Sequence, residues 1–227
     1  MKRLAAAAVA LTAVLAITGC SSGTDLSVPY NKRIYSEKQL DLIAASVQKQ
    51  LHLTGDQETS SEFNDDRGTA DVLGPGITVT PKSCANYFAA RELKLNDPTV
   101  TQLIYAAIDS HPTFAIGTAP NTAKPVTSVI SDEKKLVAAC GSAIFHGSQG
   151  SSPVSYTTTN VATNADNSIA VTETIYDDND EVVGTNVTLE ALSGNIVIEV
   201  DRDGSTSTAG FAAIVNAAIA GAKKTGH

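Results

Sequence analysis

The chain has no tryptophan, only one methionine (the initiator) and three cysteines among its 227 residues. So few cysteines exclude a disulfide-dense mini-protein. Lys and Arg number 16 against 24 Asp and Glu, and the resulting net charge of −8 opposes nucleic-acid binding, because too few cations are present to neutralise phosphates. The composition, 42% hydrophobic and 18% charged, is that of a globular protein and excludes wholesale disorder or a collagenous repeat.

The first twenty residues predict export. Lys2 and Arg3 precede an apolar stretch of 14 residues, 4–17, which fits a signal-peptide core and is shorter than the roughly 20 residues of a spanning helix. The stretch runs into Ile-Thr-Gly before Cys20, which resembles a bacterial lipobox, whose cysteine is acylated before cleavage. An ordinary secretory peptide with a chance cysteine is the alternative.

Cleavage before Cys20 would remove residues 1–19 as a lipoprotein signal peptide, leaving 208 residues with a net charge of −10. Because two or more acyl chains, such as palmitate, give stable attachment, we expect a lipid anchor on the extracytoplasmic face of the plasma membrane. Residues 20–35 would form a membrane-proximal tether, and residues 36–224 a single domain. The acidic charge predicts a poor fit to anionic lipid headgroups or wall phosphates.

With Cys20 assigned to lipid, Cys84 and Cys140 remain. In an oxidising compartment an even pair predicts a disulfide, here closing a loop of 56 residues. Two buried free thiols or a catalytic thiol are the alternatives, but a catalytic thiol needs a basic neighbour, and no partner motif is recognisable.

The first half predicts mainly helices. Ser36 and Gln39 form a capping box for a helix over 36–52, and Pro81 begins a helix that carries Cys84. A further helix, which starts at Ser128 or Ser131, carries Leu136, Val137, Cys140 and Ile144. Between these helices we expect a solvated acidic loop over 54–73, strands at 76–80 and 113–118, and a helix or strand over 100–108.

The second half predicts a sheet. Runs 154–163, 168–176, 182–192 and 195–201 alternate with period two and are joined by short polar breaks, which indicates a four-stranded antiparallel meander. A helical stripe follows and ends at Lys223 and Lys224. The fold class is therefore α+β, an antiparallel sheet with helices packed mainly on one face and one disulfide.

No motif predicts catalysis, a metal or a cofactor. Ser131 and Lys134 match Ser-x-x-Lys, and residues 224–226 read Lys-Thr-Gly, but a helix cap and a chain end explain both. The run 177–181 is typical of a hairpin tip rather than a calcium loop. The histidines lack zinc-ligand spacing, and we expect His146 to end the Cys140 helix. They are His52, His111, His146 and His227.

The order of these elements, with Pro-Lys-Ser before Cys84 and Val-Ala-Ala before Cys140, resembles the PknH-like extracellular sensor domains of actinobacteria over about residues 36–224. The family usually carries a second disulfide in the sheet, whereas this chain has no cysteine after Cys140. The resemblance implies a cleft for an undefined small ligand, no known catalysis and the Cys84–Cys140 bridge.

The sequence therefore predicts a lipid-anchored, non-catalytic ligand-binding or sensor domain of the cell envelope. Two alternatives stay open. One is a carrier that holds a lipid or glycolipid in an apolar cavity, which, with only six tyrosines and five phenylalanines, would need aliphatic walls. The other is a module that binds an envelope protein.

Overall fold

The structure is a computed structural model that describes residues 28–58, 73, 75–95, 104–118, 128–148 and 150–225. The predicted leader, the predicted acylation site Cys20, most of the acidic loop and the end of the Lys-Thr-Gly motif lie outside these residues.

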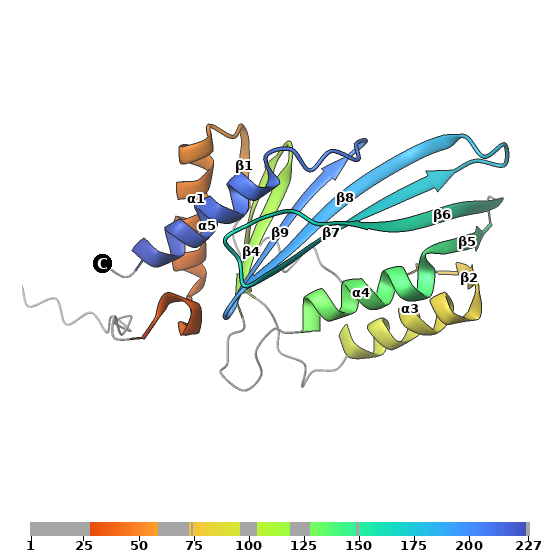
Figure 1. Ribbon diagram of the computed structural model, residues 1–227, viewed down its shortest axis with the longest axis horizontal. Helices are drawn as coiled ribbons and strands as arrows, with labels where there is room; N and C mark the ends of the chain where they lie inside the picture. Colours follow the sequence, from red (N-terminus) through yellow and green to blue (C-terminus); the bar gives the residue numbers. More distant parts are fainter. Residues whose placement is uncertain are drawn as a thin grey trace, which may run out of the picture.

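Nine described strands form one antiparallel sheet in the order β1-β3-β4-β9-β8-β7-β6-β5-β2 (Figure 1). The predicted meander is confirmed as β6 to β9, whose members pair with their sequence neighbours. The strands are β1 (Gly55–Glu58), β2 (Thr78–Thr80), β3 (Ile104–Ser110), β4 (Thr113–Thr118), β5 (Ser142–Gly147), β6 (Gly150–Thr159), β7 (Asn167–Tyr176), β8 (Val182–Ser193) and β9 (Ile196–Asp203).

The helices divide between the two faces of this sheet (Figure 1). On one face α1 and α5 pack over Ile196, Ile198 and Val200 of β9, and on the other α3 and α4 form a second core that includes Val197. The helical elements are η1 (Tyr30–Lys32), α1 (Glu37–Leu51), α3 (Lys82–Leu95), α4 (Ser128–Cys140) and α5 (Phe211–Lys224).

The α+β class, the antiparallel sheet and the disulfide are confirmed, but the helices do not lie mainly on one face. The reason is that the central strands β7 and β9 are apolar on both sides: Ala170 faces one core, whereas Ile169 and Val171 face the other. Such strands need cover on both faces.

Three local expectations are corrected. The segment left open as helix or strand, 100–108, contributes strand β3, which pairs with β1 and β4. The acidic loop begins with strand β1. The Cys140 helix ends at Cys140 and does not continue to Ile144; β5 starts at Ser142 and holds Ile144 and His146. In each case pairing with neighbouring strands of the sheet overrides the local pattern.

Residues 28–35, assigned by sequence to the tether, pack against the domain. The Tyr35 side chain is 1% exposed, and its hydroxyl lies 2.9 Å from the Tyr30 carbonyl and 3.3 Å from that of Ala222. Arg33 is also buried and donates to the Thr225 carbonyl at 3.1 Å. The folded part therefore includes the chain from about Val28.

Across the described ranges, none of the helices combines the length and apolarity that a membrane span requires.

Candidate ligand-binding cavity

A cavity of about 250 Å³ lies on the face of the sheet that carries α3 and α4. Its apolar walls are two helical residues and two strand residues, and its polar walls come mainly from β7, β8 and β9. The lining residues are Phe88 of α3, Glu133 and Leu136 of α4, Tyr156 of β6, Val171 and Glu173 of β7, Asn186, Thr188 and Glu190 of β8, and Glu199 of β9.

Strand register gathers the carboxylates. Side chains alternate along a strand, so Glu190 and Glu199, which face each other in the β8–β9 ladder, point to the same face. Glu190 is only 8% exposed. Like charges directly opposite each other on neighbouring strands are destabilising.

Tyr156 and Glu173 form a second cross-strand pair. The Tyr156 hydroxyl donates to Glu173 Oε1 at 2.8 Å. Burial, followed by the nearby charge of Glu173, raises the pKa of the Tyr156 hydroxyl well above its usual value. The phenol therefore stays protonated and acts as a hydrogen-bond donor at neutral pH.

Asp201 extends the acidic surface beyond Glu199. Burial, and then the charge of Glu199, raise the pKa of the Asp201 carboxyl to about 7, although the Thr188 hydroxyl donates to it. Thr188 also lines the cavity and pairs with Asp201 in the ladder. Asp201 is consequently a carboxyl whose charge changes near neutral pH.

No Lys or Arg is among the described residues that line the cavity. The carboxylates of four glutamates, Glu133, Glu173, Glu190 and Glu199, line this small volume. Its apolar walls include Phe88, Leu136 and Val171. Because low-dielectric walls strengthen the field of charges, the carboxylates give the cavity a negative potential, and they provide several hydrogen-bond acceptors.

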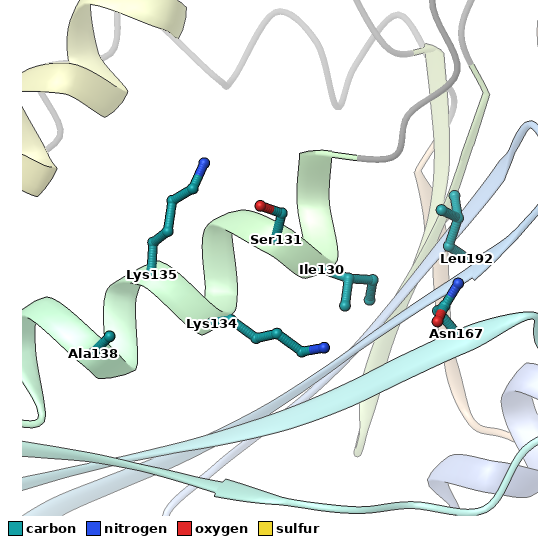
Figure 2. A pocket seen from close by; sticks show the side chains of 7 residues that line it. All are labelled: Ile130, Ser131, Lys134, Lys135, Ala138, Asn167 and Leu192. Atoms are coloured by element: carbon teal, nitrogen blue, oxygen red, sulfur yellow. The ribbon is translucent and has the colours of Figure 1, made fainter.

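A second hollow, an open groove of about 440 Å³, runs between α4 and the sheet (Figure 2). Ser131 and Lys134 of the Ser-x-x-Lys match both line it, but the Ser131 hydroxyl and the Lys134 amine point in different directions (Figure 2). Lys135 forms an ion pair with Asp132 at 3.1 Å. The groove shows no arrangement that would activate the serine.

The two cysteines assigned to a disulfide are brought together. Cys84 of α3 and Cys140, the last residue of α4, are both fully buried and joined by a disulfide with a Cα–Cα distance of 4.7 Å. The bridge fixes one end of the α3–α4 pair, which contributes Phe88 and Leu136 to the cavity.

The other candidate residues are engaged elsewhere. In β5, His146 places its Nδ1 2.8 Å from the Ser151 hydroxyl and its Nε2 3.2 Å from that of Thr80. Asp177 caps the β7–β8 hairpin by accepting from the backbone N–H groups of Glu181 and Asn179, and these bonds lower its pKa. Within the described residues, no three His, Cys, Asp or Glu side chains are placed to hold a metal ion.

Comparison with solved structures gives a match over most of the chain. The extracellular domain of PknH from Mycobacterium tuberculosis aligns with a TM-score of 0.50 and 12% identity, covering 85% of this chain and 99% of that one. The two domains share one fold. An Rv0999 ortholog from Mycobacterium smegmatis aligns at a TM-score of 0.46 and 14% identity, over 82% of this chain and 99% of its own. The resemblance stated from sequence is confirmed at the level of the fold.

No protein-family model matches the chain, and no curated protein sequence matches it either.

Sequence reasoning did not identify the acidic cavity. Part of the signal was present: Glu190 alternates with Leu189 and Ala191, and Glu199 and Asp201 alternate with Ile198 and Val200, which lie in the core under α1 and α5. In a sheet with one solvated face such residues are simply exposed. Glu190 and Glu199 line a cavity because α3 and α4 cover part of that face.

Proposed function

We propose that the chain is a lipid-anchored, extracytoplasmic binding or sensor domain of an actinobacterial cell envelope, and that its acidic cavity takes a small cationic ligand without catalysing a reaction. The observation that carries this proposal is the cavity itself, which four glutamates line, with no lysine or arginine among the described lining residues.

The location rests on the sequence and on the fold. The apolar stretch 4–17 followed by Ile-Thr-Gly and Cys20 is the pattern of a lipoprotein leader. The disulfide between Cys84 and Cys140 suits an oxidising compartment. The likeness to an extracellular domain supports a location on the extracytoplasmic side of the membrane.

The size and lining of the cavity favour a compact amine. Sites for drug-sized ligands start at roughly 300 Å³, so about 250 Å³ suits a smaller molecule. An ammonium group would donate charge-assisted hydrogen bonds to Glu173 and Glu199, and its alkyl part would contact Phe88 and Leu136. The same carboxylates oppose a lipid carrier, because burying them beside acyl chains would be costly.

Native mass spectrometry and calorimetry on residues 21–227 test this proposal, with spermidine, putrescine and choline as probes. We expect at least one probe to bind with one-to-one stoichiometry. Glu199→Gln should weaken that binding by about tenfold or more, which corresponds to one charge-assisted hydrogen bond.

Glu181→Gln is the matched control, since it removes the same charge from the exposed hairpin tip. Binding that weakens equally in both variants would reflect net charge alone and contradict the cavity assignment. Binding of none of the three amines, together with release of an endogenous neutral lipid, would favour the carrier instead.

A further inference from the structure

Exposed lysines gather at one end of this protein, where α1 and the last turn of α5 are found (Figure 1). The acidic β7–β8 hairpin tip, Asp177–Glu181, lies at the opposite end, although Glu37 and Asp41 of α1 neighbour Lys38 and Leu42 in the chain. We call this group of lysines the basic end; it consists of Lys32, Lys38, Lys49, Lys223 and Lys224, all exposed.

Contacts between distant segments assemble the basic end. The Lys223 amine lies 4.9 Å from the centre of the Tyr30 ring, which brings the end of α5 against η1. Arg33 and Tyr35 hydrogen-bond to carbonyls in the last turn of α5 and just after it. Within the described residues none of the five lysines forms an ion pair, so their charges are left for an external partner.

Two exposed apolar side chains lie among these lysines. Ile34 is 40% exposed, because its neighbours Arg33 and Tyr35 turn inward. Leu42 is 57% exposed and follows Lys38 by one turn of α1. Helical geometry places Lys38, Leu42 and Lys49 on one stripe, directly opposite the buried face of α1.

The predicted lipid anchor at Cys20 is close to the basic end along the chain. Arg33 Nε donates to the Val28 carbonyl at 2.8 Å, which holds the start of the described chain beside the basic end. Only residues 21–27 separate Val28 from Cys20, and they span at most about 28 Å when extended. An acyl group on Cys20 would therefore hold this end close to the bilayer.

We propose that the basic end docks on an anionic phospholipid surface, with Ile34 and Leu42 entering the headgroup region. The hairpin tip then projects away from the bilayer. Each lysine near an anionic surface strengthens association by about fivefold, so several of them orient a domain that is already tethered. The carboxylates of the hairpin tip lie at the opposite end of the domain, so salt screens their repulsion of an anionic surface, and the five lysines outnumber Glu37 and Asp41, the acidic residues of α1.

The test uses the full chain, expressed with its own leader in a bacterial host, and purified with its lipid. It is reconstituted on vesicles of phosphatidylglycerol and phosphatidylcholine, and separately on vesicles of phosphatidylcholine alone. Acetylation of lysines is then followed by mass spectrometry. We expect Lys38, Lys223 and Lys224 to react several-fold more slowly on the anionic vesicles, and Lys82 and Lys134, which lie outside the basic end, to react equally on both.

A matched pair of variants checks the charge dependence. Lys38→Glu with Lys224→Glu should abolish the protection at Lys223, whereas Lys82→Glu with Lys134→Glu changes the net charge equally and should preserve it. Equal reactivity of all lysines on the two vesicles, or equal effects of the two variants, would overturn the docking surface.

The docking surface uses the lipid anchor of the proposed function but not its cavity. Failure of the purified chain to pellet with phosphatidylcholine vesicles would contradict the anchor alone. In that case the docking surface is tested by co-sedimentation of the unlipidated chain with phosphatidylglycerol vesicles. Binding that is lost in the variant Lys38→Glu with Lys224→Glu supports the docking surface. Absence of any binding by the native chain refutes it.

Discussion

Asp201 should dominate the pH dependence of folding. Its pKa is raised to about 7 by burial and by the charge of Glu199, whereas an unperturbed aspartate titrates near 3.8. Between these values the folded protein retains a proton that the unfolded chain has released, so the free energy of unfolding falls as the pH rises through this window. Above about pH 7 the carboxyl is ionised in both states, and the loss is complete.

The magnitude follows from the size of the shift. One pKa unit corresponds to about 1.4 kcal/mol, so a shift of about three units corresponds to a loss of up to roughly 4 kcal/mol. Asp201 is partly accessible to water and shares its environment with Glu199. We therefore expect about 2–4 kcal/mol, a substantial part of the roughly 5–15 kcal/mol that stabilises a typical domain.

Asp201→Asn isolates this contribution. The asparagine keeps an oxygen that accepts from the Thr188 hydroxyl but cannot ionise. The variant should be about as stable as the native protein near pH 4, and more stable by about 2–4 kcal/mol near pH 8. Urea unfolding followed by far-ultraviolet circular dichroism measures the difference, because the chain contains no tryptophan to serve as a fluorescent reporter.

Asp178→Asn is the control, since this carboxyl is exposed at the hairpin tip. A stability difference between the native protein and Asp201→Asn that stays constant from about pH 4 to about pH 8 would refute the reasoning.

Two further predictions concern the scaffold. Replacing both Cys84 and Cys140 by alanine should lower the free energy of unfolding by about 4 kcal/mol, because the bridge closes a loop of 56 residues; an unchanged urea midpoint would show that the bridge adds no stability. Gly194→Ala should destabilise by more than about 2 kcal/mol, since Gly194 has a φ of 60° and an added Cβ would overlap the Asn31 carbonyl oxygen. Gly147→Ala, where a Cβ meets open space, is the control, and equal urea midpoints for the two alanine variants would contradict this account.

Local patterns predicted much of the fold. Period-two alternation found the four strands of the meander, because each run is long enough to show its period. The capping box at Ser36 and Gln39 located the start of α1, where the Ser36 backbone N–H donates to Gln39 Oε1 at 2.9 Å. Counting cysteines found the Cys84–Cys140 bridge.

Two strands, β1 and β5, escaped the same reasoning. β1 has only four residues, too few to establish a period, whereas β2 was found from the alternation of residues 76–80. β5 follows α4 after a single residue, and its apolar residue Ile144 continues the helical spacing of Leu136 and Cys140. In each case the strand is stabilised by its partner in the sheet, which no local window contains.

The amino-acid sequence by itself determined the α+β class, the strands of the meander and the disulfide between Cys84 and Cys140. Each of these depends on the spacing of residues along the chain. The tertiary structure alone decided which helices cover which face, and thereby that Glu190 and Glu199 line a cavity rather than a solvated surface. It also gathered lysines from η1, α1 and α5 into one end. A net charge counts residues without their positions, whereas an electric field depends on where folding places them.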